Sequence, residues 1–138
     1  MTNYLGKKAH FSKTLSETDL YLYAGITGDL NPVHVNEEFA KTTRFKKRIA
    51  HGLLTASYIC MPLGMYLPGP GTIQISQYLD FLKPVYIGDT INVELEVTEI
   101  LEKGRLKIRT LLKNQNHEPV IDGYAIVIPP KKDNHEIQ

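Results

Sequence analysis

A carboxylate and an imidazole stand five residues apart in the segment Asp29-Leu30-Asn31-Pro32-Val33-His34. Asn31-Pro32 marks a rigid turn, because the residue before a proline avoids helical geometry. Such a turn can aim Asp29 and His34 into one pocket, where a water molecule held between them would meet a base and an acid at once. The same spacing also suits a plain helix exit, with Asp29 capping a nearby backbone N–H and His34 hydrogen-bonded at the surface. The spacing alone leaves both interpretations open.

The rest of the sequence offers little competing chemistry. It contains no glycine-rich phosphate loop, no metal-spaced cluster of His, Cys and carboxylates, and no Ser/His/Asp signature. Sixteen basic against fifteen acidic side chains give a net charge of +1, so nucleic acid is not expected as a partner. The densest basic group is Arg44, Lys46, Lys47 and Arg48, which is either a docking point for a phosphorylated ligand or a solvated loop.

The single cysteine, Cys60, excludes an intramolecular disulfide and any cysteine-based metal cluster. Its neighbours Tyr58, Ile59 and Met61 predict a small buried apolar side chain at this position. The first residues, Met1 to Lys8, lack the apolar core of a secretory signal. We therefore expect a cytoplasmic protein.

Short elements are predicted around the Asp/His segment. Apolar residues at helical spacing predict a helix over Glu17–Thr27, begun by Ser16 as N-cap and ended by Gly28. An edge strand is expected before it, over residues 8–13. After the turn, Asn36 can cap a short helix over residues 37–40, and residues 41–50 read as a charged loop.

No charged residue occurs between Gly52 and Leu79. The first part of this segment, residues 52–63, is apolar on every side, which predicts a helix buried all round. A membrane span needs roughly 20 apolar residues. Pro62 and Gly64 interrupt this one, and Pro68 to Gly71 close it. The pattern therefore favours a core helix.

Beyond residue 71 the hydrophobic period changes from helical to two. The alternating segments, at residues 73–81, 91–97 and 106–112, predict strands with one buried and one wet face. Turns are indicated at residues 86–89, 102–104 and 114–116. Residues 120–128 are apolar on both faces apart from Asp122, which predicts a central or covered strand. Pro129-Pro130 ends it, and residues 131–138 read as a frayed polar tail.

These elements predict one domain over residues 1–138, with its core in residues 6–129. An antiparallel sheet would curl its apolar face around the apolar helix, in an α+β architecture. The sheet covers only one side of that helix. A second subunit is the simplest source of more cover, so we expect a homodimer or a dimer of dimers.

The segment from Tyr23 to His34, continued to Ala40, resembles the hydratase 2 motif of the MaoC-like family. Ala50-His51-Gly52 is similar to the family's second marker, and the order of elements agrees over roughly residues 6 to 129. The resemblance implies a hot-dog fold, an antiparallel sheet wrapped around a central helix, in a homodimer. It also implies (R)-specific hydration of trans-2-enoyl-CoA to (R)-3-hydroxyacyl-CoA without metal or organic cofactor.

The same resemblance implies roles for individual residues. Asp29 and His34 would position and deprotonate the water and return a proton to the alpha carbon, and Asn31 would help to hold the loop in shape. Gly52 would place its backbone N–H near the thioester oxygen, which suits the positive end of a helix. His51 is read as a structural or supporting residue. Cys60 falls where some relatives carry a small hydroxyl side chain, which puts a polar role there in doubt.

Two alternatives remain open. A 3-hydroxyacyl-[acyl-carrier-protein] dehydratase would run the same chemistry backwards on another carrier. A non-catalytic acyl-CoA-binding protein could share the fold, although binding alone does not require both Asp29 and His34.

Overall fold

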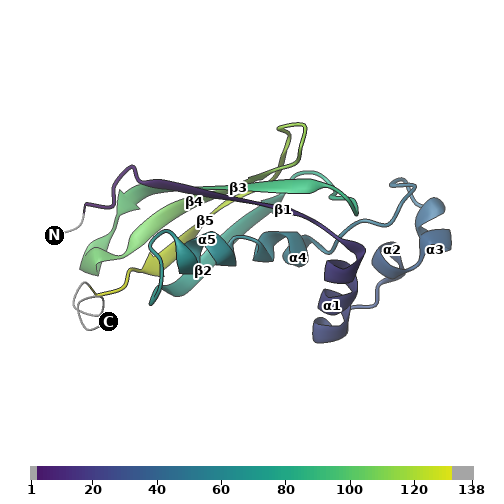
Figure 1. The fold of residues 1–138 in the computed structure, drawn as a ribbon, viewed down its shortest axis with the longest axis horizontal. Helices are drawn as coiled ribbons and strands as arrows, with labels where there is room; N and C mark the ends of the chain where they lie inside the picture. The colour runs from purple at the N-terminus through teal and green to yellow at the C-terminus, as the bar shows by residue number, and fades with distance from the viewer. Residues whose placement is uncertain (1–2, 132–138) are drawn as a thin grey trace.

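The computed structural model describes residues 3–131, which form one five-stranded antiparallel sheet with short helices on one face and at one end (Figure 1). The strands are β1 (Lys8–Thr14), β2 (Ile73–Phe81), β3 (Thr90–Ile100), β4 (Leu106–Lys113) and β5 (Pro119–Ile128). Their order across the sheet is β1-β3-β4-β5-β2. The predicted edge position of β1 and central position of β5 are therefore confirmed.

Helix α1 (Glu17–Thr27) has the predicted bounds because both its ends are capped. Ser16 Oγ accepts a hydrogen bond from the Asp19 N–H at 3.0 Å, and the Asp19 carboxylate accepts from the Ser16 N–H at 3.3 Å. This capping box satisfies two backbone donors that the first turn leaves free. Gly28 ends the helix at φ 78°, a left-handed conformation that glycine adopts without strain.

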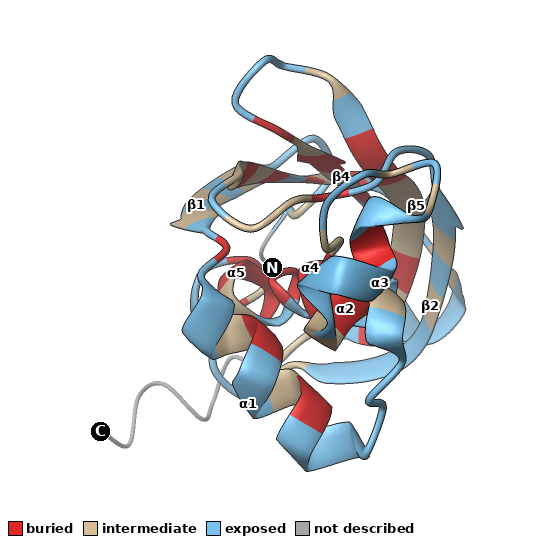
Figure 2. Ribbon diagram, turned by 90° about the vertical axis from the view of Figure 1, so that its right-hand side faces the viewer, coloured by how far each residue is buried: buried red, intermediate tan, exposed pale blue. Residues whose placement is uncertain are grey.

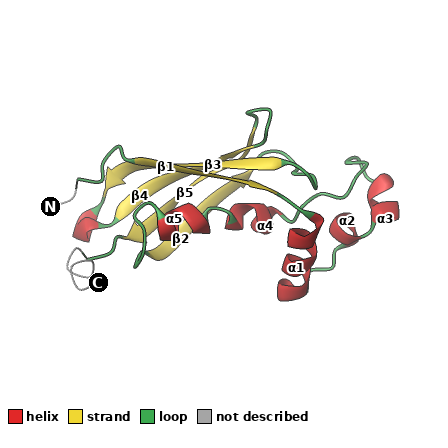
Figure 3. Ribbon diagram, viewed as in Figure 1, coloured by secondary structure: helices red, strands yellow, loops and turns green. Residues whose placement is uncertain are grey.

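The predicted turn at Asn31-Pro32 opens a four-residue helix, α2 (Pro32–Val35). Proline fits the first helical position because that residue's N–H has no partner within the helix. Asn31 Oδ1 accepts from the Val33 N–H at 3.2 Å and so caps α2. The next helix, α3 (Glu37–Lys41), is capped by Asn36 as predicted. Helices α1 to α3 lie together beyond one end of the sheet (Figure 3).

The single helix predicted over residues 52–63 is wrong: this segment forms α4 (Gly52–Ser57) and α5 (Cys60–Met65). Pro62 has no N–H for the Tyr58 carbonyl, and a proline ring crowds the carbonyl four residues before it. The Tyr58 and Ile59 N–H groups bond three residues back, to Thr55 and Ala56, at 3.1 and 3.0 Å. The chain therefore tightens between the two helices.

The sheet curves around α4 and α5 (Figure 2), but it does not enclose them. Leu53 is 58% exposed and Cys60 is also exposed, so the predictions of all-round burial and of a buried Cys60 are wrong for the single chain. Both residues line a cavity between these helices and β2. None of the helices in residues 3–131 is long and apolar enough to cross a membrane.

Strands β3 and β4 show the predicted alternation of buried and wet side chains. The largest fully buried side chains are Leu15, Leu20, Ile91, Val93, Leu95, Val97, Leu106, Ile108, Leu112, Val120, Ile121 and Val127. Strand β2 departs from the prediction, because Ile73 is 59% exposed and most of the strand lies open on both faces. It is an edge strand with an irregular register between Gln74 and Ser76. Of the predicted polar tail, residues 132–138 lie outside the described residues.

Candidate active site

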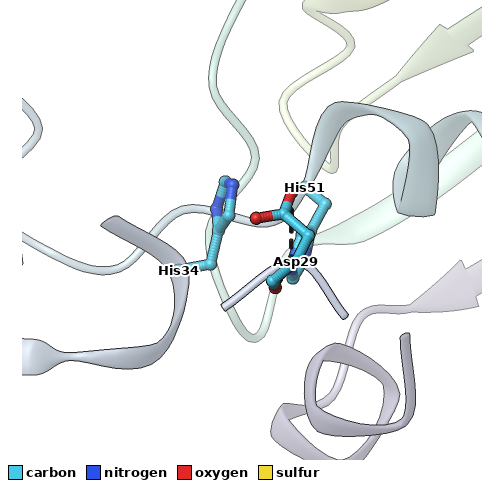
Figure 4. Close-up of side chains that lie close together, drawn as sticks. All are labelled: Asp29, His34 and His51. Carbon is cyan, nitrogen blue, oxygen red and sulfur yellow. Dashed lines mark hydrogen bonds and ion pairs between the residues drawn. The ribbon is translucent and has the colours of Figure 1, made fainter. Parts of the chain in front are cut away.

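Asp29, His34 and His51 come together where α1, α2 and α4 meet (Figure 4). One carboxylate oxygen of Asp29 and one ring nitrogen of each histidine all lie within 4.8 Å of one another. Asp29 follows the end of α1, His34 lies in α2, and His51 directly precedes α4. The structure thus brings together the two residues predicted as a catalytic pair and a third that was expected only to support them.

Asp29 has one carboxylate oxygen engaged in the turn and a second directed at the cluster. Oδ1 accepts from the Asn31 N–H at 3.0 Å, which is the capping role that a plain helix exit predicts. Oδ2 lies 4.0 Å from His51 Nε2. The side chain is about half exposed. Asp29 therefore shapes the turn and keeps an oxygen available to a ligand.

His34 is buried, at 8% exposure, which contradicts the interpretation that places it at the surface. Its Nδ1 lies 2.7 Å from the main-chain oxygen of Ile49. A carbonyl oxygen only accepts, so Nδ1 carries the proton and the Nε2 of a neutral ring keeps its lone pair. Burial lowers the pKa of His34, as does nearby His51, while the Ile49 carbonyl and Asp29 oppose the shift. A neutral imidazole with a free lone pair can accept a proton from water.

His51 is packed against two aromatic rings and is only 3% exposed. Its ring stacks on His34 with centroids 4.0 Å apart, and the Tyr23 ring lies 4.9 Å away. His51 Nε2 lies 3.0 Å from the main-chain oxygen of Asp29. The only signal in the sequence for this position is the Ala50-His51-Gly52 marker, since no periodicity links His51 to Asp29.

A cavity of about 530 Å³ opens beside the three side chains. Its lining consists of Tyr23, Asp29, His34, Arg44, Phe45, Ile49, Ala50, His51, Gly52, Leu53, Thr55, Phe81, Leu82, Lys83, Pro84, Val85 and Ile121. The polar cluster forms one part of the wall, and apolar side chains from β2, β5 and the helices form much of the rest. A pocket with a few converging polar groups in an apolar wall is typical of a small-molecule site.

Gly52 approaches the aromatic wall closely. A Cβ at this position would lie 2.7 Å from Phe81 Cε1. Gly52 is also the first residue of α4, and no described residue accepts a hydrogen bond from its N–H. The glycine thus combines an unengaged backbone donor with a place in the lining of a cavity that a side chain would narrow.

Asp29, His34 and His51 are also the described residues best placed to hold a metal ion. Zinc binds imidazole nitrogen and carboxylate oxygen at about 2.0–2.2 Å, which requires ligand atoms roughly 3.5 Å apart. The Asp29 and His51 atoms stand 4.0 Å apart, and one nitrogen of each imidazole already faces a main-chain carbonyl. The cluster would have to contract to bind zinc.

The four residues of the predicted basic group, Arg44 and residues 46–48, do not all face the cavity or solvent. Arg44 lines the cavity, and Lys46 and Lys47 are exposed on the same loop. Arg48 points elsewhere: its guanidinium donates to Glu17, Glu37 and the Tyr21 hydroxyl at 2.8–2.9 Å. These bonds raise the pKa of Arg48. The expectation that Arg48 docks a phosphate is not supported, because two carboxylates already occupy it.

The same architecture occurs in the unliganded R-hydratase from Pseudomonas aeruginosa, which is 44% identical in sequence. The match covers 93% of this chain and 83% of that one, with a TM-score of 0.88. The fold class is therefore that of the R-hydratases, and the predicted hot-dog fold is confirmed.

The MaoC-like domain family matches residues 2–118 of the sequence. An (R)-specific enoyl-CoA hydratase of Rhodospirillum rubrum is 47% identical over 128 residues, which are 92% of this chain and 88% of the relative. A 3-hydroxybutyryl-CoA dehydratase of Methylorubrum extorquens is 46% identical over 121 residues, 88% of this chain and 77% of the relative. The chain belongs to the MaoC-like family.

Proposed function

We propose that this protein is an (R)-specific enoyl-CoA hydratase, which adds water to a trans-2-enoyl-CoA to give (R)-3-hydroxyacyl-CoA. The observation that carries the proposal is the convergence of the Asp29 carboxylate and the His34 imidazole on one cavity with apolar walls. The 47% identical relative named (R)-specific enoyl-CoA hydratase supports the same reaction.

In the proposed reaction, a water molecule sits between Asp29 and His34. The water oxygen forms a bond to the β-carbon while a proton passes to the pair, and the pair returns a proton to the α-carbon. The free Nε2 lone pair of His34 and the second oxygen of Asp29 are the groups available for these transfers. Precisely held general acid–base groups of this kind accelerate a reaction by about 10²–10⁴-fold.

Gly52 and Asn31 are proposed to support this step. Gly52 lines the cavity, and its N–H would stabilise the negative charge that develops on the thioester oxygen. Asn31 caps α2 and so keeps the residues on either side of Pro32 in place. Arg44, Lys46 and Lys47 are proposed to receive the phosphates of CoA, since Arg44 lines the cavity and the two lysines lie on its loop.

A homodimer is part of the proposal, because large apolar side chains on α4, α5 and β2 are exposed in the single chain. Leu53, Met65, Ile73 and Ile75 are all exposed there, and β2 pairs only with β5 among the described strands. A second cavity, of about 480 Å³, lies between these helices and β2. A second copy of the chain would cover this surface. A cytoplasmic location is also proposed, which a lone thiol suits.

The test follows the loss of absorbance of crotonyl-CoA and then octenoyl-CoA, with chiral analysis of the product. Asp29→Asn and His34→Ala should each lower turnover by about 10²-fold or more, with a smaller change in KM. His10→Ala, at an exposed histidine on β1, is the matched control. Near-normal turnover in either site variant would remove that residue from the proposed pair, and an (S) product would exclude the proposed stereochemistry.

Dehydration of 3-hydroxyacyl groups carried by acyl carrier protein is the second candidate, favoured by the 35% identical relative from Arabidopsis thaliana named a mitochondrial 3-hydroxyacyl-[acyl-carrier-protein] dehydratase. It uses the same residues in reverse. Comparing kcat/KM for CoA and acyl-carrier-protein thioesters of one acyl group separates the two functions. Acyl-CoA binding without turnover would instead indicate a binding protein.

A further inference from the structure

The proposed reaction uses Asp29 and His34 but leaves the third member of the cluster, His51, without a role. His51 is nonetheless the most buried of the three. Burying an imidazole beside another costs free energy unless its polar atoms are satisfied. The contacts of each ring atom therefore indicate what His51 does.

The hydrogen bond from His51 fixes where its proton lies. The acceptor, the main-chain oxygen of Asp29, has no proton to give, so Nε2 must be the donor at 3.0 Å. The contact joins residues 22 positions apart in the chain, and it reaches the backbone of the residue that carries the reacting carboxylate. On its flat side, the same ring stacks against His34 at 4.0 Å. One side chain thus touches both members of the proposed pair.

The other ring nitrogen of His51 belongs to a residue one helical turn before Thr55. His51 Nδ1 and Thr55 Oγ1 are both fully buried, and neither has a hydrogen-bond partner among the described residues. The two residues are four apart on one helical face and both line the cavity. Side chains at this spacing are neighbours, with Cβ atoms about 5–6 Å apart. One water molecule between them would satisfy both atoms, as buried waters commonly do.

We propose that His51 is a positioning residue: its Nε2–H holds the Asp29 main chain while its ring supports His34, so that the two reacting groups keep a fixed separation. A water bound by Thr55 Oγ1 donates to His51 Nδ1 and thereby keeps the proton on Nε2. The inference rests on the proposed hydratase activity for its kinetic consequences, but not for the state of the ring. Asp29 needs such a support because its side chain is half exposed and its own turn holds only one of its oxygens.

Two substitutions separate the hydrogen bond from the ring. His51→Gln keeps an N–H donor close to the position of Nε2 but removes the ring. His51→Phe keeps an aromatic ring beside His34 and Tyr23 but removes the donor. Misplacing a reacting group by about 1 Å can cost on the order of 10²-fold in rate. His51→Phe should therefore lower kcat by about 10- to 100-fold with KM changed less than about threefold, and His51→Gln should recover most of the loss.

The corresponding exchanges at exposed His10 are the controls, and thermal unfolding of each variant shows whether the kinetic loss follows a loss of fold. A His51→Phe variant with kcat within twofold of wild type, or with His51→Gln equally impaired, would overturn the positioning role.

The position of the proton on the His51 ring can be measured with long-range ¹H–¹⁵N correlation spectra of the ¹⁵N-histidine-labelled protein. The resonances are assigned by single substitutions. The His51 proton should lie on Nε2, with a lone pair on Nδ1, and Thr55→Val should perturb the Nδ1 resonance. A proton on Nδ1, or a Thr55→Val spectrum identical to wild type, would overturn the tautomer and the water bridge respectively. If the wild-type protein fails to hydrate enoyl-CoA, the proposed function fails while these spectra still decide the state of His51.

Discussion

Main-chain carbonyls, rather than charged partners, set the proton positions in the site. Ile49 fixes the proton of His34, and Asp29 fixes that of His51. Two neutral imidazoles can stack closely, whereas two imidazolium rings would repel each other. In the proposed reaction, the chemistry therefore depends on keeping His34 unprotonated.

This dependence predicts a pH profile. Burial lowers the pKa of His34 below its ordinary value of 6.5, so the neutral form persists at neutral pH. The kcat/KM for hydration should be flat around neutrality and fall in acid with a midpoint below 6.5. The assay should use a pantetheine thioester as substrate, because the titration of the CoA phosphate then does not contribute to the profile. NMR titration of His34 measures its pKa directly.

The stability of the fold should change with pH in the same direction as the activity: both should decrease as the pH falls. The unfolded chain takes up the His34 proton first as the pH falls below 6.5, so the contribution of His34 to stability decreases from that pH toward its lowered folded pKa. A His34 midpoint at or above 6.5 would contradict both expectations.

Gly52 gives a second prediction at this scale. A methyl group there would meet the Phe81 ring at 2.7 Å, so Gly52→Ala should lower kcat/KM by about tenfold or more through this overpacking. Adding Phe81→Leu should restore much of the loss. Gly25→Ala is a matched control, because a Cβ at Gly25 meets nothing within 4 Å. A double variant no better than Gly52→Ala would mean that the clash with Phe81 is not the cause.

Sequence reasoning predicted which residues lie in the site, but it did not predict most of the contacts between them. Asp29 and His34 could be predicted because a short motif holds both. The bond from His51 to the Asp29 carbonyl could not, since it joins main chain to side chain across the fold. The ion pairs of Arg48 could not be predicted for a similar reason: one of its partners, Glu17, lies 31 residues away on α1.

Among the elements, those with local signals were predicted correctly. Helix α1 carries its caps in its own sequence, and β3 and β4 carry a strict period of two. The segment of α4 and α5 was harder, because its apolar residues are continuous and the effect of Pro62 competes with that pattern. The exposed faces of β2 and α4 depend on what else packs there, which no local pattern contains.

The loop between α3 and α4 carries the two lysines that are proposed to bind the phosphates of CoA. Lys46→Ala with Lys47→Ala should raise KM for enoyl-CoA about threefold to tenfold at low salt, with kcat nearly unchanged, because exposed charges bind ground and transition states alike. Moderate salt should reduce the difference by screening. Arg48→Ala is the contrasting variant: it breaks the bonds to Glu17 and Glu37 and should lower the melting temperature. Equal KM values for wild type and the double lysine variant at both salt concentrations would identify Lys46 and Lys47 as solvated surface.

At the scale of the whole molecule, the uncovered apolar surface predicts association. Sedimentation should show a dimer or a multiple of it, and Ile75→Lys should shift the equilibrium toward monomer by placing a charge in the surface. Ile100→Lys, at a half-exposed residue near the end of β3, is the control and should leave the dimer intact. A stable, fully active monomer at nanomolar concentration would contradict both the dimer and the need to cover β2.

The cavity draws its proposed reacting groups and part of its apolar wall from different parts of the chain. Asp29, His34 and His51 come from the segments between α1 and α4, whereas Phe81 and Ile121 face each other across the pairing of β2 with β5. Substitutions on the strands can therefore reshape this wall, which would hold the acyl chain in the proposed reaction, without changing Asp29, His34 or His51. The same separation makes Phe81 and Ile121 the natural positions at which to engineer the accepted chain length.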